Sequence, residues 1–83
     1  MNLNENFLKA AERVHTLPQK PSNENLLKMY GLYKQATEGD VQGEQPGGFD
    51  FKGLAKYNSW ASLRGTSKET AMQQYIELVE SLF

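Results

Sequence analysis

The sequence predicts an all-α domain, a bundle of four helices, and three observations support this prediction. Apolar residues recur at helical spacing in four separate segments. A capping residue precedes each segment, and prolines or glycines separate the segments. The chain has 83 residues, which suffices for one domain with a modest core. We therefore expect residues 1–83 to form a single domain.

The first helix is expected at residues 3–17. Asn2 and Glu5 are spaced as a loose cap pair at its start. Pro18 and Pro21 end it, because proline cannot continue a helix interior. Its narrow apolar stripe consists of Leu3, Phe7, Ala10, Val14 and Leu17.

The second helix is expected to begin near Ser22 or Asn23, which are both good N-caps, and to stop at Gly39. Its apolar arc consists of Leu26, Met29, Tyr30, Tyr33 and Ala36. Residues 40–49 are rich in glycine and contain a proline, so they predict a surface loop. The loop is long for a helix–helix connection, which indicates either a function or packing of its own.

The third helix is expected at residues 51–63 with Asp50 as its cap. Its two neighbouring faces consist of Leu54, Tyr57 and Ala61, and of Lys52, Lys56 and Trp60. Thr66 and Glu69 have the spacing of a capping box, so the last helix follows them to the end of the chain. Its broad apolar face consists of Ala71, Met72, Tyr75, Ile76, Leu78, Val79, Leu82 and Phe83.

Composition excludes several functional classes. Nine basic and ten acidic residues give a net charge of −1, which argues against a general nucleic-acid binder. The chain has no cysteine and one histidine, so thiol catalysis is excluded and no metal site is expected. No apolar run approaches the roughly 20 residues of a membrane span, and the N-terminus lacks a secretion-signal pattern. We therefore expect a cytoplasmic protein that does not insert stably into membranes.

Tyrosines and lysines on two helices form the candidate binding site. Tyr30, Tyr33 and Lys34 are neighbours on the second helix by their spacing. Lys52 and Lys56 lie one turn apart on the third, beside another tyrosine. Taken alone, each group could equally consist of tyrosines at the edge of the core and lysines exposed to solvent. Together they suit a nucleotide, because phosphates attract cations and a base stacks on aromatic faces.

Two further residues, Tyr75 and His15, each allow two interpretations. Tyr75 lies inside the apolar face of the last helix, so it is either a core tyrosine or a ligand contact. His15, at the edge of the first helix's stripe, fits a surface residue better than a ligand contact. Trp60 fits a packing residue. No serine has the Gly-x-Ser-x-Gly setting and no P-loop is present, so we expect a binding protein without catalytic residues or a cofactor.

These residues and their order resemble the acyl-CoA-binding protein family. The similarity runs without a gap from Phe7 to the C-terminus. Its motifs are Leu32-Tyr33-Lys34-Gln35-Ala36-Thr37-Glu38-Gly39-Asp40, Pro46-Gly47, Asp50-Phe51-Lys52-Gly53, Ala55-Lys56-Tyr57, Trp60, Gly65-Thr66-Ser67-Lys68-Glu69 and Ala71-Met72-Gln73-Gln74-Tyr75-Ile76. Two departures are His15, where many relatives have lysine, and Tyr57, where tryptophan is usual.

The resemblance implies an up-down-down-up bundle that binds medium- to long-chain acyl-CoA and acts as a monomeric, non-enzymatic carrier and pool former. It also implies roles for individual residues. Tyr30, Lys34 and Lys56 would engage the 3′-phosphate end of CoA, Tyr33 and Tyr75 would help to hold the nucleotide, and Phe7, Ala11 and Leu27 would line an acyl groove. Lys52 occupies a family lysine position, and His15 would give a weaker, pH-dependent cationic contact.

Acyl-CoA is thus the expected ligand rather than a cofactor, and enzymes that use acyl-CoA are expected partners. Two other functions stay open from the residues alone. A protein–protein module could use the same tyrosines and methionines to hold an amphipathic helix. A nucleic-acid module could place the lysines on phosphates, although the charge balance opposes it.

Overall fold

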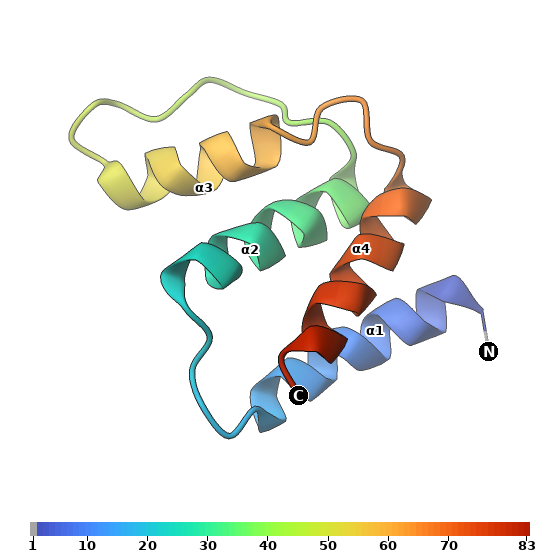
Figure 1. Ribbon diagram of the computed structural model, residues 1–83. Coiled ribbons are helices and arrows are strands. Elements are labelled where there is room, and N and C mark those ends of the chain that lie inside the picture. Colours follow the sequence, from blue (N-terminus) through green and yellow to red (C-terminus); the bar gives the residue numbers. More distant parts are fainter. Residues whose placement is uncertain (1) are drawn as a thin grey trace.

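The computed structural model describes residues 2–83, and all regular structure in that range is helical (Figure 1). The α-helices are α1 (Leu3–Arg13), α2 (Asn23–Glu38), α3 (Phe51–Ala61) and α4 (Lys68–Ser81), with a 3₁₀ turn, η1 (Val14–Thr16), directly after α1. The predicted all-α fold with four helices is confirmed.

The four helices have the up-down-down-up order. In Figure 1, α2 and α3 run in the same direction, whereas α1 and α4 run in roughly the opposite one. The segment between α2 and α3 makes this possible, because it carries the chain back along α3 to the starting end of α2 (Figure 1). α2 packs against both α3 and α4, and α4 packs against α1.

Side chains cap the helices mostly where the sequence predicts. The side-chain oxygens of Asn2, Ser22 and Asp50 each accept a hydrogen bond from the backbone N–H three residues later, at 2.8, 3.1 and 2.9 Å. These bonds satisfy N–H groups that have no partner within the helix.

Three predicted helix ends were wrong, one of them that of the third helix, which ends at Ala61 rather than at Leu63. The first α-helix ends at Arg13 rather than at Leu17. The last residues tighten into η1, the Thr16 hydroxyl bonds the Arg13 carbonyl at 2.7 Å, and Leu17 is extended, as a residue before proline prefers. At α4 the cap is Ser67, which accepts from Thr70 N–H at 3.0 Å, and not Thr66. Two adjacent residues could cap this helix, and the structure uses the second.

The core lies between α1, α2 and α4. Its buried apolar residues are Phe7, Ala10, Met29, Leu32, Ala36, Ala71, Tyr75 and Val79. None of them belongs to α3, whose residues are all at least partly exposed. The third helix is therefore attached mainly to the surface of α2.

The contact between α2 and α3 is close because Gly31 has no side chain. A Cβ atom at Gly31 would lie 2.7 Å from Ser59 Oγ and 2.8 Å from the Ser59 carbonyl oxygen. Ser59 Oγ also donates a hydrogen bond to the Leu27 carbonyl at 2.5 Å. The two helix backbones thus nearly touch at this point.

A buried glutamine joins the end of α2 to the turn before α4. Gln35 is fully buried, and its Nε2 donates to Asp40 Oδ1 at 2.9 Å and to the Thr66 carbonyl at 2.7 Å. Asp40 Oδ1 also accepts from Gly65 N–H at 2.8 Å. The hydrogen bond from Gly65 N–H lowers the pKa of the Asp40 carboxyl, and the hydrogen bond from Gln35 lowers it further by a smaller amount.

The long loop after α2 packs on α3. Trp60 Nε1 donates to the Gly39 carbonyl at 2.8 Å, and the Tyr57 hydroxyl donates to the Gly43 carbonyl at 3.4 Å. Gly43 has a φ of 90°, a backbone conformation that glycine adopts without strain. Trp60 therefore acts as a packing residue, as its sequence setting predicts.

Candidate functional site

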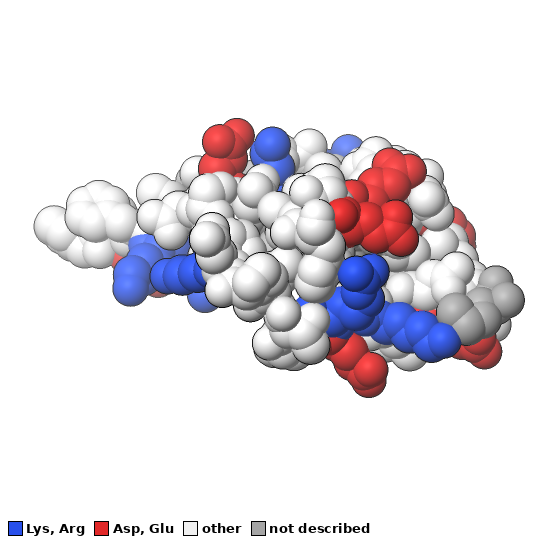
Figure 2. Space-filling view, turned by 60° about the horizontal axis from the view of Figure 1, so that its bottom comes forward, with Lys and Arg blue, Asp and Glu red and all other residues white. Residues whose placement is uncertain are grey.

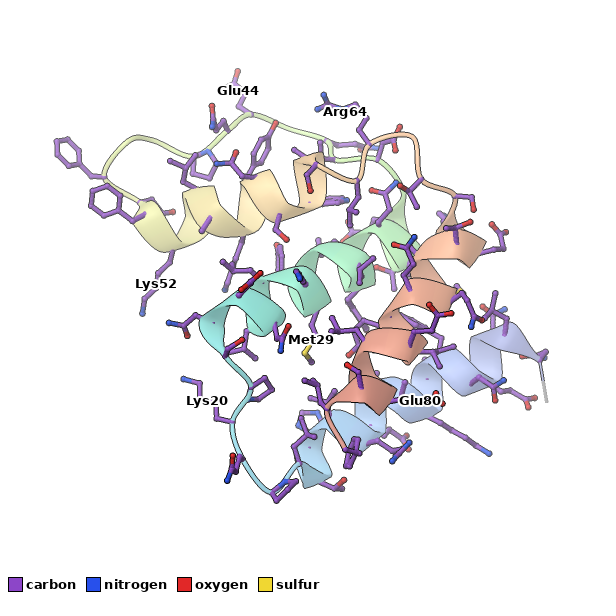
Figure 3. All side chains as sticks on the ribbon, in the orientation of Figure 1. Lys20, Met29, Glu44, Lys52, Arg64 and Glu80 are labelled. Atoms are coloured by element: carbon purple, nitrogen blue, oxygen red, sulfur yellow. The ribbon has the colours of Figure 1, made fainter. Side chains whose placement is uncertain are left out.

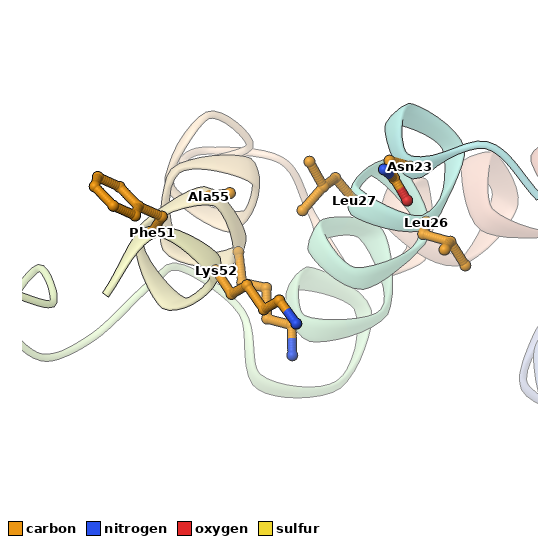
Figure 4. Close-up of a pocket in the computed structure, with 7 residues that line it drawn as sticks. Asn23, Leu26, Leu27, Phe51, Lys52 and Ala55 are labelled. Atoms are coloured by element: carbon orange, nitrogen blue, oxygen red, sulfur yellow. The ribbon is translucent and has the colours of Figure 1, made fainter. Parts of the chain in front are cut away.

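A cavity of about 420 Å³ lies between the first turns of α2 and α3 (Figure 4). Leu27 and Ala55 point toward each other across it in Figure 4, one from each helix. Its lining residues are Asn23, Leu26, Leu27, Phe51, Lys52, Ala55 and Lys56. The walls are mostly apolar, and two lysines of α3 supply the charge.

One of the two lysines that line the cavity contacts a tyrosine of α2. Lys52 and Lys56 lie one turn apart on α3 and both line it. Lys56 Nζ lies 5.5 Å from the ring centre of Tyr30, within the range of a cation–π contact. The structure thus brings Tyr30 and Lys56 together from two different helices, and Lys52 lines the same cavity as Lys56.

Lys34 already has an anionic partner. Its ammonium group hydrogen-bonds Glu38 one turn further along α2, and Nζ lies 4.8 Å from the ring centre of Trp60. The hydrogen bond to Glu38 raises the pKa of Lys34. An incoming phosphate would have to compete with this carboxylate for the same ammonium group.

Three aromatic rings from three helices form a cluster. The rings of Phe7 and Tyr33 are stacked with centres 5.5 Å apart, and Tyr75 meets both nearly edge-on at 5.1 and 6.0 Å. Tyr75 is buried, and burial, with a smaller effect from Tyr33, raises the pKa of its phenol. Tyr33 is 40% exposed, so the aromatic cluster reaches the protein surface through the Tyr33 ring.

The remaining candidates lie elsewhere. Phe7 is buried in the aromatic cluster, Ala11 is half-buried on α1, and neither lines the α2–α3 cavity. His15 is exposed on η1. Leu27, Lys52 and Lys56 were predicted from the sequence as ligand contacts and do line the cavity, whereas four other lining residues were not predicted. They are Asn23, Leu26, Phe51 and Ala55.

The missed residues had only a weak signal in the sequence. Leu26 and Leu27 are adjacent apolar residues, so the second faces away from the arc that the first occupies and needs another partner. Phe51 is apolar and directly follows the cap of α3. Neither feature reveals a cavity until the two helices are known to be parallel neighbours.

This arrangement suits an anionic molecule with an apolar part. Within residues 2–83, no group of three or more His, Asp or Glu side chains is placed to hold a metal ion. In the same range, no helix is long and apolar enough to cross a membrane. Fold and site define a small helical domain of the ligand-binding class, with cations and aromatic rings next to an apolar cavity.

Comparison with known proteins places the domain within that class. A family model described as acyl CoA binding protein matches residues 4–79. The chain belongs to the acyl-CoA-binding protein family, as the sequence motifs indicate.

Individual relatives match over nearly their full length. The acyl-CoA-binding protein of Gossypium hirsutum is 48% identical over 83 residues, covering 100% of this chain and 93% of the relative. That of Dictyostelium discoideum is 47% identical over 76 residues, covering 92% and 90%. The crystal structure of Oryza sativa acyl-CoA-binding protein 2 superposes with a TM-score of 0.92 at 47% identity, covering 98% of this chain and 90% of that one.

Proposed function

We propose that this protein binds medium- to long-chain acyl-CoA thioesters and acts as a monomeric cytoplasmic carrier and pool former. The observation that carries the proposal is the apolar cavity between α2 and α3, with Lys52 and Lys56 in its wall and Tyr30 beside it. Family membership supports the same ligand. Delivery to enzymes that use acyl-CoA follows as the proposed role.

The headgroup would be held by charge and by aromatic faces. Lys34 and Lys56 would bind the 3′-phosphate end of CoA with help from the Tyr30 hydroxyl, since ammonium groups and phenols donate hydrogen bonds to phosphate oxygens. The partly exposed Tyr33 would contact the nucleotide. Tyr75 is buried behind it and would hold that ring in place.

The acyl chain would leave water for apolar surface. The cavity of about 420 Å³ falls within the range of about 300–1,000 Å³ for ligand sites. Leu27 would contact the chain within the cavity, and Phe7 and Ala11 on α1 would contact a part that extends beyond it. Each methylene group that becomes buried should add about 0.8 kcal/mol, roughly a fourfold gain in affinity. Lys52 and His15 would add weaker cationic contacts.

Calorimetric titration with palmitoyl-CoA, below its micelle concentration, tests this function. We expect one-to-one binding that is much tighter than binding of free CoA or palmitate, because the proposed site would contact both ends of the ligand. A series of shorter acyl-CoAs should lose roughly fourfold in affinity per methylene group while the chain stays within the cavity. Recovery of the thioester unhydrolysed would separate a carrier from a hydrolase. Equal affinity for palmitoyl-CoA and free CoA would disprove the proposal.

Removing the charge of Lys34 should weaken binding. Lys34→Ala is expected to cost about 1.5–3 kcal/mol of binding free energy, as for a lost charged hydrogen bond. Lys34→Met should cost nearly as much, although its chain can still cover the Trp60 ring. Lys28→Ala is the matched control, because Lys28 lies on the same helix in a similar pair with Glu24 at 3.5 Å. If Lys34→Ala and Lys28→Ala bind alike, Lys34 is not part of the site.

A further inference from the structure

Two aromatic side chains project into solvent where the long loop meets α3. Phe49 is 99% exposed and Phe51 is 74% exposed. The surroundings are open, since added Cβ atoms at Gly47 and Gly48 would find no atom within 4 Å. In Figure 4 the Phe51 ring points away from α2. Phe49 thus gains almost nothing from the packing of the fold and Phe51 gains little, although exposed phenylalanine is costly in water.

Basic side chains accompany these rings. Lys52 and Lys56 follow on the first two turns of α3, and both are exposed. Figure 3 shows Lys52 extending from the start of α3, and Figure 2 shows basic side chains beside the uncharged group that protrudes at this end. We define the aromatic tip as Phe49, Phe51, Lys52 and Lys56.

The net charge of residues 47–56, which contain the aromatic tip, differs in sign from that of the whole chain. Residues 47–56 contain two lysines and one aspartate, a net charge of +1, whereas the chain carries −1. The aspartate, Asp50, lies between the two phenylalanines, but its carboxylate accepts the Gly53 N–H at the start of α3. The tip therefore combines protruding apolar rings with a local positive charge.

We propose that the aromatic tip docks reversibly on an anionic membrane surface. Phenylalanine rings insert at the boundary between headgroups and acyl chains, and lysines are attracted to anionic lipids. A lipid surface fits better than a folded protein partner, because two isolated rings offer far less area than a stable protein interface of about 1,000 Å². With only two rings and two lysines, the attachment is weak enough to reverse.

Docking would also orient the α2–α3 cavity. Phe51, Lys52 and Lys56 belong to both the aromatic tip and the cavity wall. A docked molecule would therefore bring the cavity next to the lipid, which would allow an amphiphile to pass between them. This last step depends on the proposed acyl-CoA function, whereas the docking itself does not.

Cosedimentation of the full chain with lipid vesicles, without acyl-CoA, tests the docking. Vesicles of phosphatidylcholine and phosphatidylserine should retain the protein at low salt, and vesicles of phosphatidylcholine alone should retain much less, because the lysine contribution is electrostatic. Phe49→Ala should weaken binding to the anionic vesicles roughly tenfold, since one ring no longer inserts. Lys52→Ala should weaken it about fivefold.

The controls separate docking from folding and from ligand binding. Phe83→Ala removes another exposed phenylalanine, far along the chain, and should leave vesicle binding unchanged. Phe49→Trp should preserve vesicle binding, and the fluorescence of the added tryptophan should shift to shorter wavelength when vesicles are added. Phe49 does not line the cavity, so Phe49→Ala should keep the wild-type affinity for palmitoyl-CoA. Absence of vesicle binding by the wild type, or equal losses in Phe49→Ala and Phe83→Ala, would overturn the docking proposal alone.

Discussion

Phe7→Ala is expected to lower the free energy of unfolding by about 3–5 kcal/mol, the usual cost of removing a buried phenylalanine side chain. Phe7 is only 2% exposed, and its ring contacts Tyr33 from α2 and Tyr75 from α4. Truncation would leave a cavity where three helices meet, and both tyrosine rings would lose their shared neighbour. Urea denaturation followed by circular dichroism measures the effect.

Leu8→Ala is the matched control for this prediction. Leu8 is the next residue on the same helix, but it is 58% exposed. Its replacement should change stability by no more than about 0.5 kcal/mol. Equal, small losses in both variants would show that the aromatic cluster does not stabilise the fold. Phe7→Leu, which keeps much of the volume, should retain more stability and allows the proposed acyl contact to be tested in a folded protein.

Gly31→Val is expected to destabilise the protein by about 1–3 kcal/mol and to weaken acyl-CoA binding at the same time. Intrinsic helix propensity favours valine over glycine by a few tenths of a kcal/mol. The expected loss of stability therefore comes from the steric clash with Ser59. The new Cβ would meet the backbone of Ser59 at 2.8 Å, and the two further methyl groups enlarge the conflict. Because α3 is attached mainly to α2, the cavity between them would change shape.

Thermal unfolding and palmitoyl-CoA titration of the same sample check both effects of Gly31→Val. Gly48→Val serves as the control, since a Cβ atom at Gly48 meets nothing within 4 Å. It should keep both stability and affinity close to the wild type. A Gly31→Val protein with wild-type stability would mean that α3 can move away from α2 at no cost.

Local features of the fold could be predicted from the sequence, because they depend on residues three or four positions apart. Examples are the caps at Asn2 and Asp50 and the pairing of lysines along α3. The predicted N-cap of α4 was wrong by one residue, because Thr66 and Ser67 are chemically almost equivalent as caps. The up-down-down-up order came only from the family resemblance, since helical periodicity contains no information about direction.

The site was harder to predict than the helices. Spacing placed Lys52 and Lys56 on one face of α3, but the cavity arises between helices whose contact depends on one glycine. Phe7 shows the same difficulty in another form. A buried core ring and a groove-lining ring have the same place in an apolar stripe, and only packing shows that the Phe7 ring is buried against Tyr33 and Tyr75.

The parallel course of α2 and α3 has an electrostatic consequence. Antiparallel neighbours largely cancel their helix macrodipoles, whereas parallel neighbours add them and repel each other slightly. The contact at Gly31 and the bond from Ser59 to the Leu27 carbonyl offset that repulsion. Asn23 and Phe51, the first residues of the two helices, both line the cavity. Two partial positive charges, together roughly one elementary charge before capping, therefore face the same end of the molecule as Lys52 and Lys56.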